Sequence, residues 1–163
     1  MIEVSLSESE VTVGATVGIM RRVESVFAAR AQTVPGIDAD GKGWIHDIEG
    51  ALAEMAVAKH LGRYWDASTR RFRGSRFGDV AEFQVRHGCR LDDHLIIRDH
   101  DDDAARFILV VGVAPTYRIV GSILGSDAKA EVGWRRDPGG RGKPCWFVPQ
   151  SALEPPRVPE PEL

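Results

Sequence analysis

Apolar residues in the first part of the chain recur at the spacing of an amphipathic helix. The residues that carry this periodicity are Val13, Val17, Met20 and Phe27. Ser7 and Glu10 precede them at the spacing of a capping box, in which each side chain binds a backbone amide of the other residue. The pattern predicts a helix over residues 8–31. Gly14 and Gly18 lie one turn apart on it, which favours close contact with another helix or a sheet.

A second helical pattern follows. Asp47 is the expected N-cap, the helix should reach Leu61, and Gly62 stands where a left-handed C-cap is favoured. Its apolar residues form two stripes at 100° per residue. One stripe consists of Gly50, Val57 and Leu61, and the other of Ile48, Leu52 and Met55. A helix that is apolar on two sides is expected to lie between two other layers.

Glu54 projects from this second helix beside small and apolar residues, so its carboxylate is expected to approach the core. Burial of an unpaired carboxylate lowers the free energy of unfolding by roughly several kcal/mol, so Glu54 needs a partner. An arginine, backbone donors and a metal ion are the alternatives that the sequence leaves open.

The second half of the chain is rich in β-branched residues and short turns. It predicts strands at Val80–Arg86, Leu95–Arg98, Phe107–Val113 and Tyr117–Leu124. A short helix capped by Ser126 and a last strand at residues 146–148 complete the pattern. Short connections make most neighbouring strands antiparallel. The expected fold class is α+β (α/β/α-like), with a central mixed, largely antiparallel sheet of four to five strands flanked by helices.

The length of 163 residues fits one domain, and 43% hydrophobic with 28% charged residues is typical of a chain that forms a core. We expect a single domain over residues 1–153, with a helical extension over 1–33 and a core over 44–153. Residues 154–163 contain four prolines and are expected to form an extended tail.

The distribution of charge along the chain is more informative about binding partners than the formal net charge of −3. Residues 63–76 carry five arginines against one aspartate, whereas residues 92–103 carry six aspartates against one arginine. Such patches determine which partners a protein attracts.

The N-terminus has no basic start followed by an apolar run, so export is not expected. The most apolar stretch, residues 107–124, is interrupted by Pro115 and Arg118, and no membrane partner is expected. Cys89 and Cys145 are the two cysteines, and we expect them to be reduced thiols in a cytoplasm.

Several segments, in order, resemble the PD-(D/E)XK (restriction-endonuclease-like) nuclease superfamily, and in particular small nuclease-like proteins of bacteriophages and bacteria. The resemblance rests on Gly50 to Gly62 with Glu54 inside it, Gly78-Asp-Val, and Gln84-Val-Arg86. Further matching segments are Leu95-Ile-Ile-Arg98, Leu109-Val-Val-Gly112, Tyr117-Arg-Ile-Val-Gly121 and Trp146 to Leu153. It covers roughly residues 44–153 and implies a restriction-endonuclease-like core.

The resemblance implies hydrolysis of DNA phosphodiester bonds assisted by Mg²⁺ or Mn²⁺. Glu54, Asp79 and Gln84 would hold the metal, and Arg86 would stand where this superfamily usually has a lysine. Gln84 replaces the usual acid, which removes one negative charge from the site. Arginine stays protonated in proteins, so Arg86 can bind a phosphate but is a poor proton shuttle. The hypothesis requires Glu54 and Asp79 to converge on one cation, and a salt link at either acid would compete with the ion.

The basic segment before Asp79 is the expected DNA contact, through Arg70, Arg71, Arg73 and Arg76. Tyr64 and Trp65 are aromatic neighbours that can lie against sugars or bases. A second basic run extends from Arg135 to Lys143. DNA is the expected partner, and a homodimer or a viral protein partner is left open. A phage-encoded chain would act in the host cytoplasm.

Each residue also has a structural interpretation. Glu54 can be a core acid paired with arginine, Asp79 a turn residue after Gly78, and Gln84 with Arg86 the solvent face of a half-buried strand. Two further hypotheses follow: a binding module that has lost catalysis, and an assembly component with an exposed apolar interface.

The series Asp99, Asp101 and Asp103 imitates the start of a calcium loop. Ala104 replaces the glycine that such a loop needs, and Val110 replaces its bidentate glutamate, so a charged hairpin loop is expected instead. His87 follows Arg86 directly; it could transfer protons there, but a surface role is the simpler interpretation.

Overall fold

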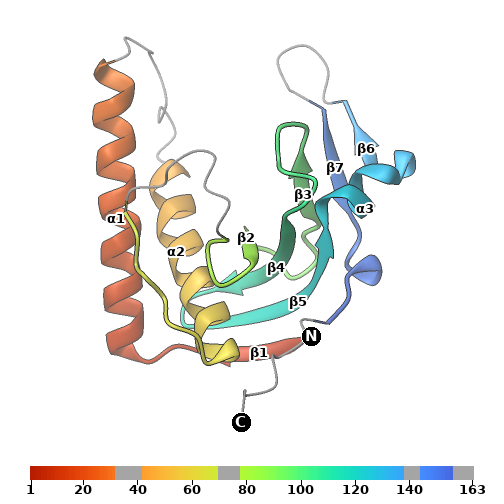
Figure 1. Ribbon diagram of the computed structural model, residues 1–163. Helices are drawn as coiled ribbons and strands as arrows, with labels where there is room; N and C mark the ends of the chain where they lie inside the picture. Colours follow the sequence, from red (N-terminus) through yellow and green to blue (C-terminus); the bar gives the residue numbers. More distant parts are fainter. Residues whose placement is uncertain (32–41, 70–77, 138–143, 156–163) are drawn as a thin grey trace.

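One long helix covers a face of a sheet, and a second long helix packs against the first, in the computed structural model, which describes residues 1–31, 42–69, 78–137 and 144–155 (Figure 1). The helices are α1 (Glu8–Ala31), α2 (Lys42–Leu61) and α3 (Gly125–Ala130), with 3-10 turns at Val132–Trp134 and Gln150–Ala152. The strands are β1 (Ile2–Ser5), β2 (Phe83–Gly88), β3 (Leu95–Arg98), β4 (Arg106–Val113), β5 (Thr116–Leu124), β6 (Arg135–Arg136) and β7 (Cys145–Val148).

The described strands form two sheets. The larger has the order β1-β5-β4-β2, in which β2 and β4 are parallel and the other pairs antiparallel. The smaller is antiparallel, with the order β3-β7-β6. The expected α+β fold with a mixed, largely antiparallel sheet is therefore present. The prediction missed β1, β6 and the division into two sheets.

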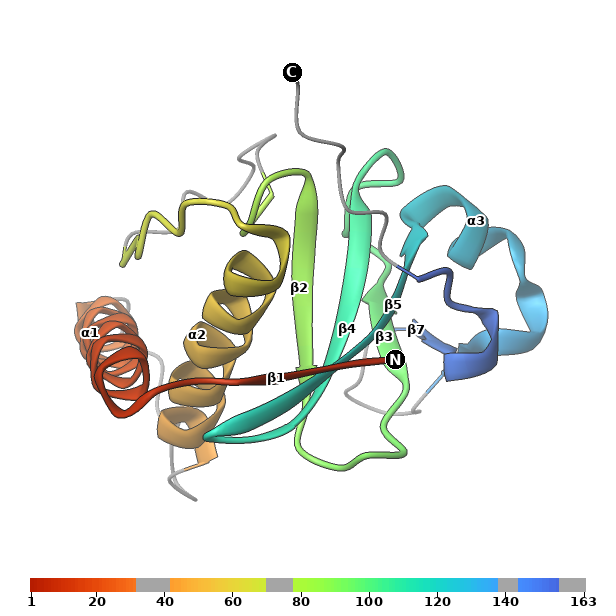
Figure 2. The ribbon, with the colours of Figure 1, turned by 90° about the horizontal axis from the view of Figure 1, so that it is seen from below.

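The molecule is layered, and Figure 2 shows the order of the layers: α1, then α2, then the larger sheet, with β7 and α3 beyond it. α2 has neighbours on two sides, which confirms the expectation from its two apolar stripes. Within the described residues, the structure contains no helix with the length and apolar character needed to cross a membrane.

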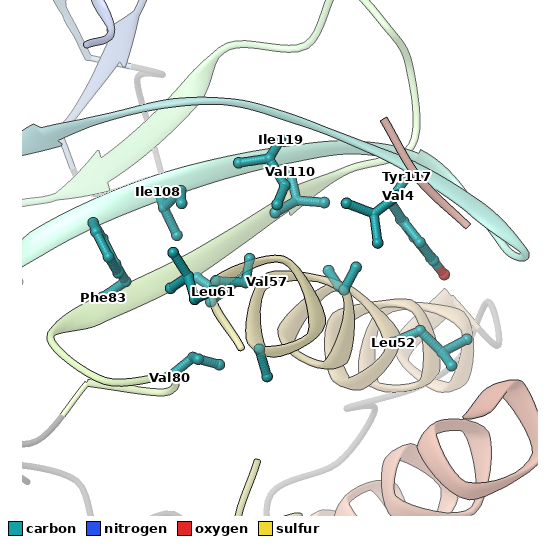
Figure 3. Close-up of a cluster of buried hydrophobic side chains, with 14 of the residues drawn as sticks. Val4, Leu52, Val57, Leu61, Val80, Phe83, Ile108, Val110, Tyr117 and Ile119 are labelled. Carbon is teal, nitrogen blue, oxygen red and sulfur yellow. The ribbon is translucent and has the colours of Figure 1, made fainter. Parts of the chain in front are cut away.

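The first core cluster lies between α2 and the larger sheet (Figure 3). Its fully buried members include Val57 of α2, Ile108 and Val110 of β4, and Tyr117 and Ile119 of β5. The second cluster covers the opposite face of that sheet. It is formed by Leu95, Ile97, Phe107, Leu109, Val111, Val120, Ala128, Trp146 and Val148. Both faces of β4 are therefore buried, which explains its nearly continuous apolar sequence.

The orientation of α1 differs from the one suggested by its apolar stripe. Val17 is 7% exposed, as a core-facing residue should be, but Val13, Met20 and Phe27 are 51%, 49% and 63% exposed. Gly14 and Gly18 instead lie on the face that meets α2. The expected close contact of these two glycines is confirmed, because small residues let two helix backbones approach.

Some local predictions were wrong. α2 begins at Lys42, so Asp47 lies inside the helix, where its Oδ2 is 2.7 Å from Arg22 Nε. Ser126 makes no cap on α3, whose N-cap is Leu124. The aspartate-rich segment after β3 is not a hairpin loop, since β3 and β4 belong to different sheets.

We expect Gly18→Ala to lower the free energy of unfolding by about 2 kcal/mol, because a Cβ there would clash with the backbone of Asp47 and Ile48. Gly50→Ala is the matched control in α2. Its Cβ would meet nothing within 4 Å, so helix propensity should raise the stability by up to ~1 kcal/mol. Urea denaturation measures both changes, and equal effects of the two substitutions would contradict the close contact.

The predicted capping box is present and is extended by a lysine. Ser7 N donates to Glu10 Oε2 at 2.6 Å, and Glu10 N donates to Ser7 Oγ at 3.3 Å. Lys59 Nζ of α2 donates to the same Glu10 oxygen at 2.7 Å. The hydrogen bond from Lys59, followed by that from Ser7, lowers the pKa of Glu10 from 4.5 to about 2.

This lowered pKa predicts a pH-dependent contribution to stability. A folded pKa below the unfolded value means that the carboxylate stabilises fully above pH 4.5 and progressively less as the pH falls towards about 2. The difference in unfolding free energy between the wild type and Glu10→Gln should shrink across that window. In a Lys59→Met background most of this dependence should vanish, and a difference that stays constant with pH would refute the assignment.

Candidate functional site

Glu54 lies in the middle of α2, is 2% exposed and faces α1. Arg21 of α1 meets it with both terminal nitrogens: Nη1 donates to Glu54 Oε1 at 2.9 Å and Nη2 donates to Oε2 at 2.8 Å. Arg21 is itself 9% exposed. The partner of Glu54 is therefore an arginine, one of the alternatives that the sequence left open.

Two further contacts fix this ion pair. Arg21 Nε donates to the backbone oxygen of Ser68 at 2.8 Å, and Trp65 Nε1 donates to Glu54 Oε2 at 3.2 Å. A planar guanidinium that binds a carboxylate with two parallel hydrogen bonds is among the strongest side-chain pairs, provided that its remaining donors are satisfied. The segment after α2 supplies an acceptor for the Nε donor.

Acids other than Glu54 also affect the pKa of Arg21. Burial lowers the pKa of Arg21, and the charges of Asp79, Asp47 and Asp66 oppose this effect. Glu54 and Asp79, which are 25 positions apart, therefore act on the same buried cation. The charge of Asp79 thus favours the charged form of the same guanidinium that Glu54 binds directly.

Asp79 shapes the turn that leads into β2. Its backbone N donates to Phe83 O at 2.7 Å, and its Oδ2 accepts from Val85 N at 2.8 Å. Ala81 inside the turn has a φ of 51°. Because β2 is an edge strand, the Asp79 carboxylate satisfies a backbone donor that faces away from β4.

Gln84 and Arg86 lie on the other face of β2. Phe83 and Val85 belong to the core cluster against α2, so alternation turns Gln84 and Arg86 towards the smaller sheet. Arg86 Nη2 donates to Asp101 Oδ1 at 3.0 Å, and its Cζ lies 4.9 Å from the centroid of the Phe107 ring.

In this arrangement Glu54, Asp79 and Gln84 do not direct their oxygens to one point, as a magnesium ion requires. Glu54 uses both oxygens on Arg21, and Gln84 is on the opposite face of the strand. Among the described residues, no group of three or more His, Cys, Asp and Glu side chains is arranged to hold a metal ion. Binding of Mg²⁺ or Mn²⁺ stays a prediction.

The aspartate-rich loop after β3 binds the ammonium group of a lysine in α3. Lys129 Nζ of α3 lies 3.1 Å from Asp99 O, 2.6 Å from Asp101 O and 2.6 Å from Asp103 Oδ1. Asp101 Oδ2 additionally accepts from the backbone N of Arg98 at 2.8 Å. The loop thus folds around the ammonium group of Lys129.

No family model, curated protein or solved structure matches this chain. The resemblance to the PD-(D/E)XK superfamily stays a prediction, and the functional argument rests on the geometry of the site.

A pocket of about 520 Å³ opens at the C-terminal end of β2, on the side of Arg86. Three arginines, three histidines and one aspartate contribute to its lining. These residues are Arg86, Arg90, Arg98, His46, His87, His94 and Asp93, and the remaining lining is Gly88, Cys89, Ile96, Leu109 and Phe147. The pocket therefore combines basic groups with an apolar wall.

The three arginines differ in how they are held. Arg86 is paired with Asp101, and its side chain is 24% exposed. Arg90 forms a solvent-exposed pair with Asp92. The guanidinium of Arg98 has no hydrogen-bond or ion-pair partner within the part of the chain that the structure describes. Arg98 is thus the cation most readily available to an incoming anion.

His87 and Cys89 lie in this pocket and away from Glu54. The Nε2 atom of His87 is 2.7 Å from Gly112 O, and its ring meets Tyr117 edge-on at 6.0 Å. Burial, followed by the charges of Glu49 and Asp93, raises the pKa of the Cys89 thiol. Cys89 and Cys145 are both free thiols.

The predicted DNA contacts Arg70, Arg71, Arg73 and Arg76 lie outside the described residues, as does the part of the second basic run from 138 to 143. Of that run, Arg135 Cζ lies 5.8 Å from the centroid of the Trp146 ring, and Arg136 Nη1 donates to Gly133 O at 2.7 Å.

Sequence reasoning missed Arg21 and the pocket. A signal for Arg21 existed, since it follows Gly14 and Gly18 on the same helical face, and a charged residue on a contact face needs a buried partner. Phe147 and Arg98 share a pocket only because β3 pairs with β7, a non-local contact with no local sequence signal.

Proposed function

We propose that this chain is a nucleic-acid-binding domain that holds phosphates in the pocket at the end of β2. One observation carries the proposal: three arginines and three histidines line this pocket with a single carboxylate, that of Asp93. Phosphate contacts from arginine and lysine supply essentially all of the non-specific affinity of proteins for nucleic acids.

The existing ion pairs still allow a phosphate to bind. The pair between Arg90 and Asp92 is exposed to water, where such pairs contribute little. Arg98 has no competing acid among the described residues. Arg86 is oriented by Asp101, so its guanidinium is already fixed at the pocket when a ligand arrives.

We expect Arg98→Ala to weaken DNA binding several-fold and to reduce the slope of log K against log salt by about 0.7–0.9, the loss of one phosphate contact. Arg118→Ala is the matched control, because it removes the same charge from β5 outside the pocket. Fluorescence anisotropy over a salt series measures both. Equal effects of the two substitutions would show that the affinity depends on overall charge and not on this pocket. If the wild-type protein binds no DNA, the proposal is refuted.

Metal-dependent hydrolysis of phosphodiester bonds is the second candidate. It rests on the resemblance to the PD-(D/E)XK superfamily, in which Glu54 and Asp79 correspond to the metal-binding acids. Because Arg21 occupies both oxygens of Glu54, hydrolysis at this site would require Arg21 to leave it.

The second candidate predicts that Mn²⁺ supports cleavage of plasmid DNA, that EDTA abolishes it, and that Asp79→Asn abolishes it while the circular dichroism spectrum is unchanged. Glu82→Gln is the control, an exposed acid of the same turn. Binding without any cleavage across Mg²⁺ and Mn²⁺ concentrations would leave the binding domain as the better account.

A further inference from the structure

The outward face of the smaller sheet presents an apolar pair to solvent. Ile96 of β3 and Phe147 of β7 are directly opposite each other in the antiparallel register. They are 39% and 36% exposed, whereas their strand neighbours Leu95, Ile97, Trp146 and Val148 are buried in the second core cluster. Directly opposed side chains on one face of an antiparallel pair lie close enough to contact each other.

This apolar pair forms a wall of the pocket. The ring of His94 meets Phe147 at a centroid distance of 6.5 Å and an angle of 65°. Leu109, 1% exposed, contributes from the larger sheet. The volume of about 520 Å³ is within the range of 300–1,000 Å³ that is usual for small-ligand sites.

Guanidinium groups lie beside the wall. Arg98 is two residues from Ile96 along β3, on the same face and roughly 7 Å away. Arg86 reaches the same pocket from β2. A ligand that fits both parts carries an aromatic or apolar ring next to an anionic group, which is the chemistry of a nucleotide.

Whether the face of a nucleobase is exposed determines which class of nucleic acid can stack on this wall. In a duplex the faces of the bases are stacked on one another and only their edges are exposed. An unpaired base presents its face, which protein aromatic rings can stack against. We propose that Phe147 and Ile96 form a stacking wall for an unpaired base, so that the domain prefers single-stranded nucleic acid. This inference rests on the proposed function.

The test compares a fluorescein-labelled 12-nucleotide DNA strand with its blunt duplex at one salt concentration. Wild-type protein should bind the single strand at least roughly 10-fold more tightly. Phe147→Ala should weaken single-strand binding roughly 5- to 100-fold and leave duplex binding unchanged. Phe147→Trp, which keeps a flat ring, should retain the preference.

Phe27→Ala is the matched control, since Phe27 is 63% exposed on α1 and lies outside the pocket. A second readout uses wild-type protein and a strand that carries 2-aminopurine, whose emission is quenched by stacking. It stays informative if Phe147→Ala does not fold, and an unquenched bound strand overturns the inference.

The outcomes separate the inference from the proposed function. Suppose that Phe147→Ala binds the single strand as tightly as wild type does, while Arg98→Ala weakens the binding of both ligands. The pocket then binds phosphates, and the inference of a stacking wall is wrong. Equal wild-type affinity for strand and duplex also overturns the inference. If wild-type protein binds neither ligand, the inference and the proposed function fail together.

Discussion

The buried ion pair between Arg21 and Glu54 determines how the α2 side of the molecule is organised. It connects α1 to α2 in an environment where either charge alone would be strongly unfavourable. Gly14 and Gly18 allow the helices to approach closely enough for the pair to form. Trp65 and Ser68 then attach the segment after α2 to the same two side chains. The ion pair thus fixes the relative position of three parts of the chain.

This organisation has a consequence for chemistry. At two places that carry carboxylates, the chain provides its own cation. Arg21 binds Glu54, and Lys129 binds the loop from Asp99 to Asp103. The basic groups at the end of β2 are instead open to a pocket. These acids are therefore paired with cations inside the fold, whereas Arg86, Arg90 and Arg98 line a pocket near β2. The proposed binding of an anionic polymer relies on these three arginines.

The parts of the fold that depend on local pattern were predictable from sequence. Helix α1 and strands β3, β4 and β5 lie close to their expected ranges, and the capping box of Ser7 and Glu10 is present. The parts that depend on pairing between distant segments were not. β1 has four residues and is defined by its partner β5, and the smaller sheet exists because β3 pairs with β7.

The candidate site follows the same division. Local reasoning identified Glu54 as an acid directed at the core and listed arginine among its partners, and it placed Gln84 and Arg86 on one face of a strand. It could not supply Arg21, which is 33 positions from Glu54 and lies on a different helix. It also did not predict that Val13, Met20 and Phe27 of α1 are exposed, because apolar spacing alone does not tell which side of a helix meets its neighbour.

A double-mutant cycle on Arg21→Met and Glu54→Leu tests the central claim most directly. Each single substitution leaves an unpaired buried charge and should lower the unfolding free energy by about 3–5 kcal/mol. The double variant should lose far less than the sum, giving a coupling energy of at least about 2 kcal/mol in urea denaturation. Single effects that add to within about 0.5 kcal/mol would show that the two side chains do not interact, and would contradict this account of the fold.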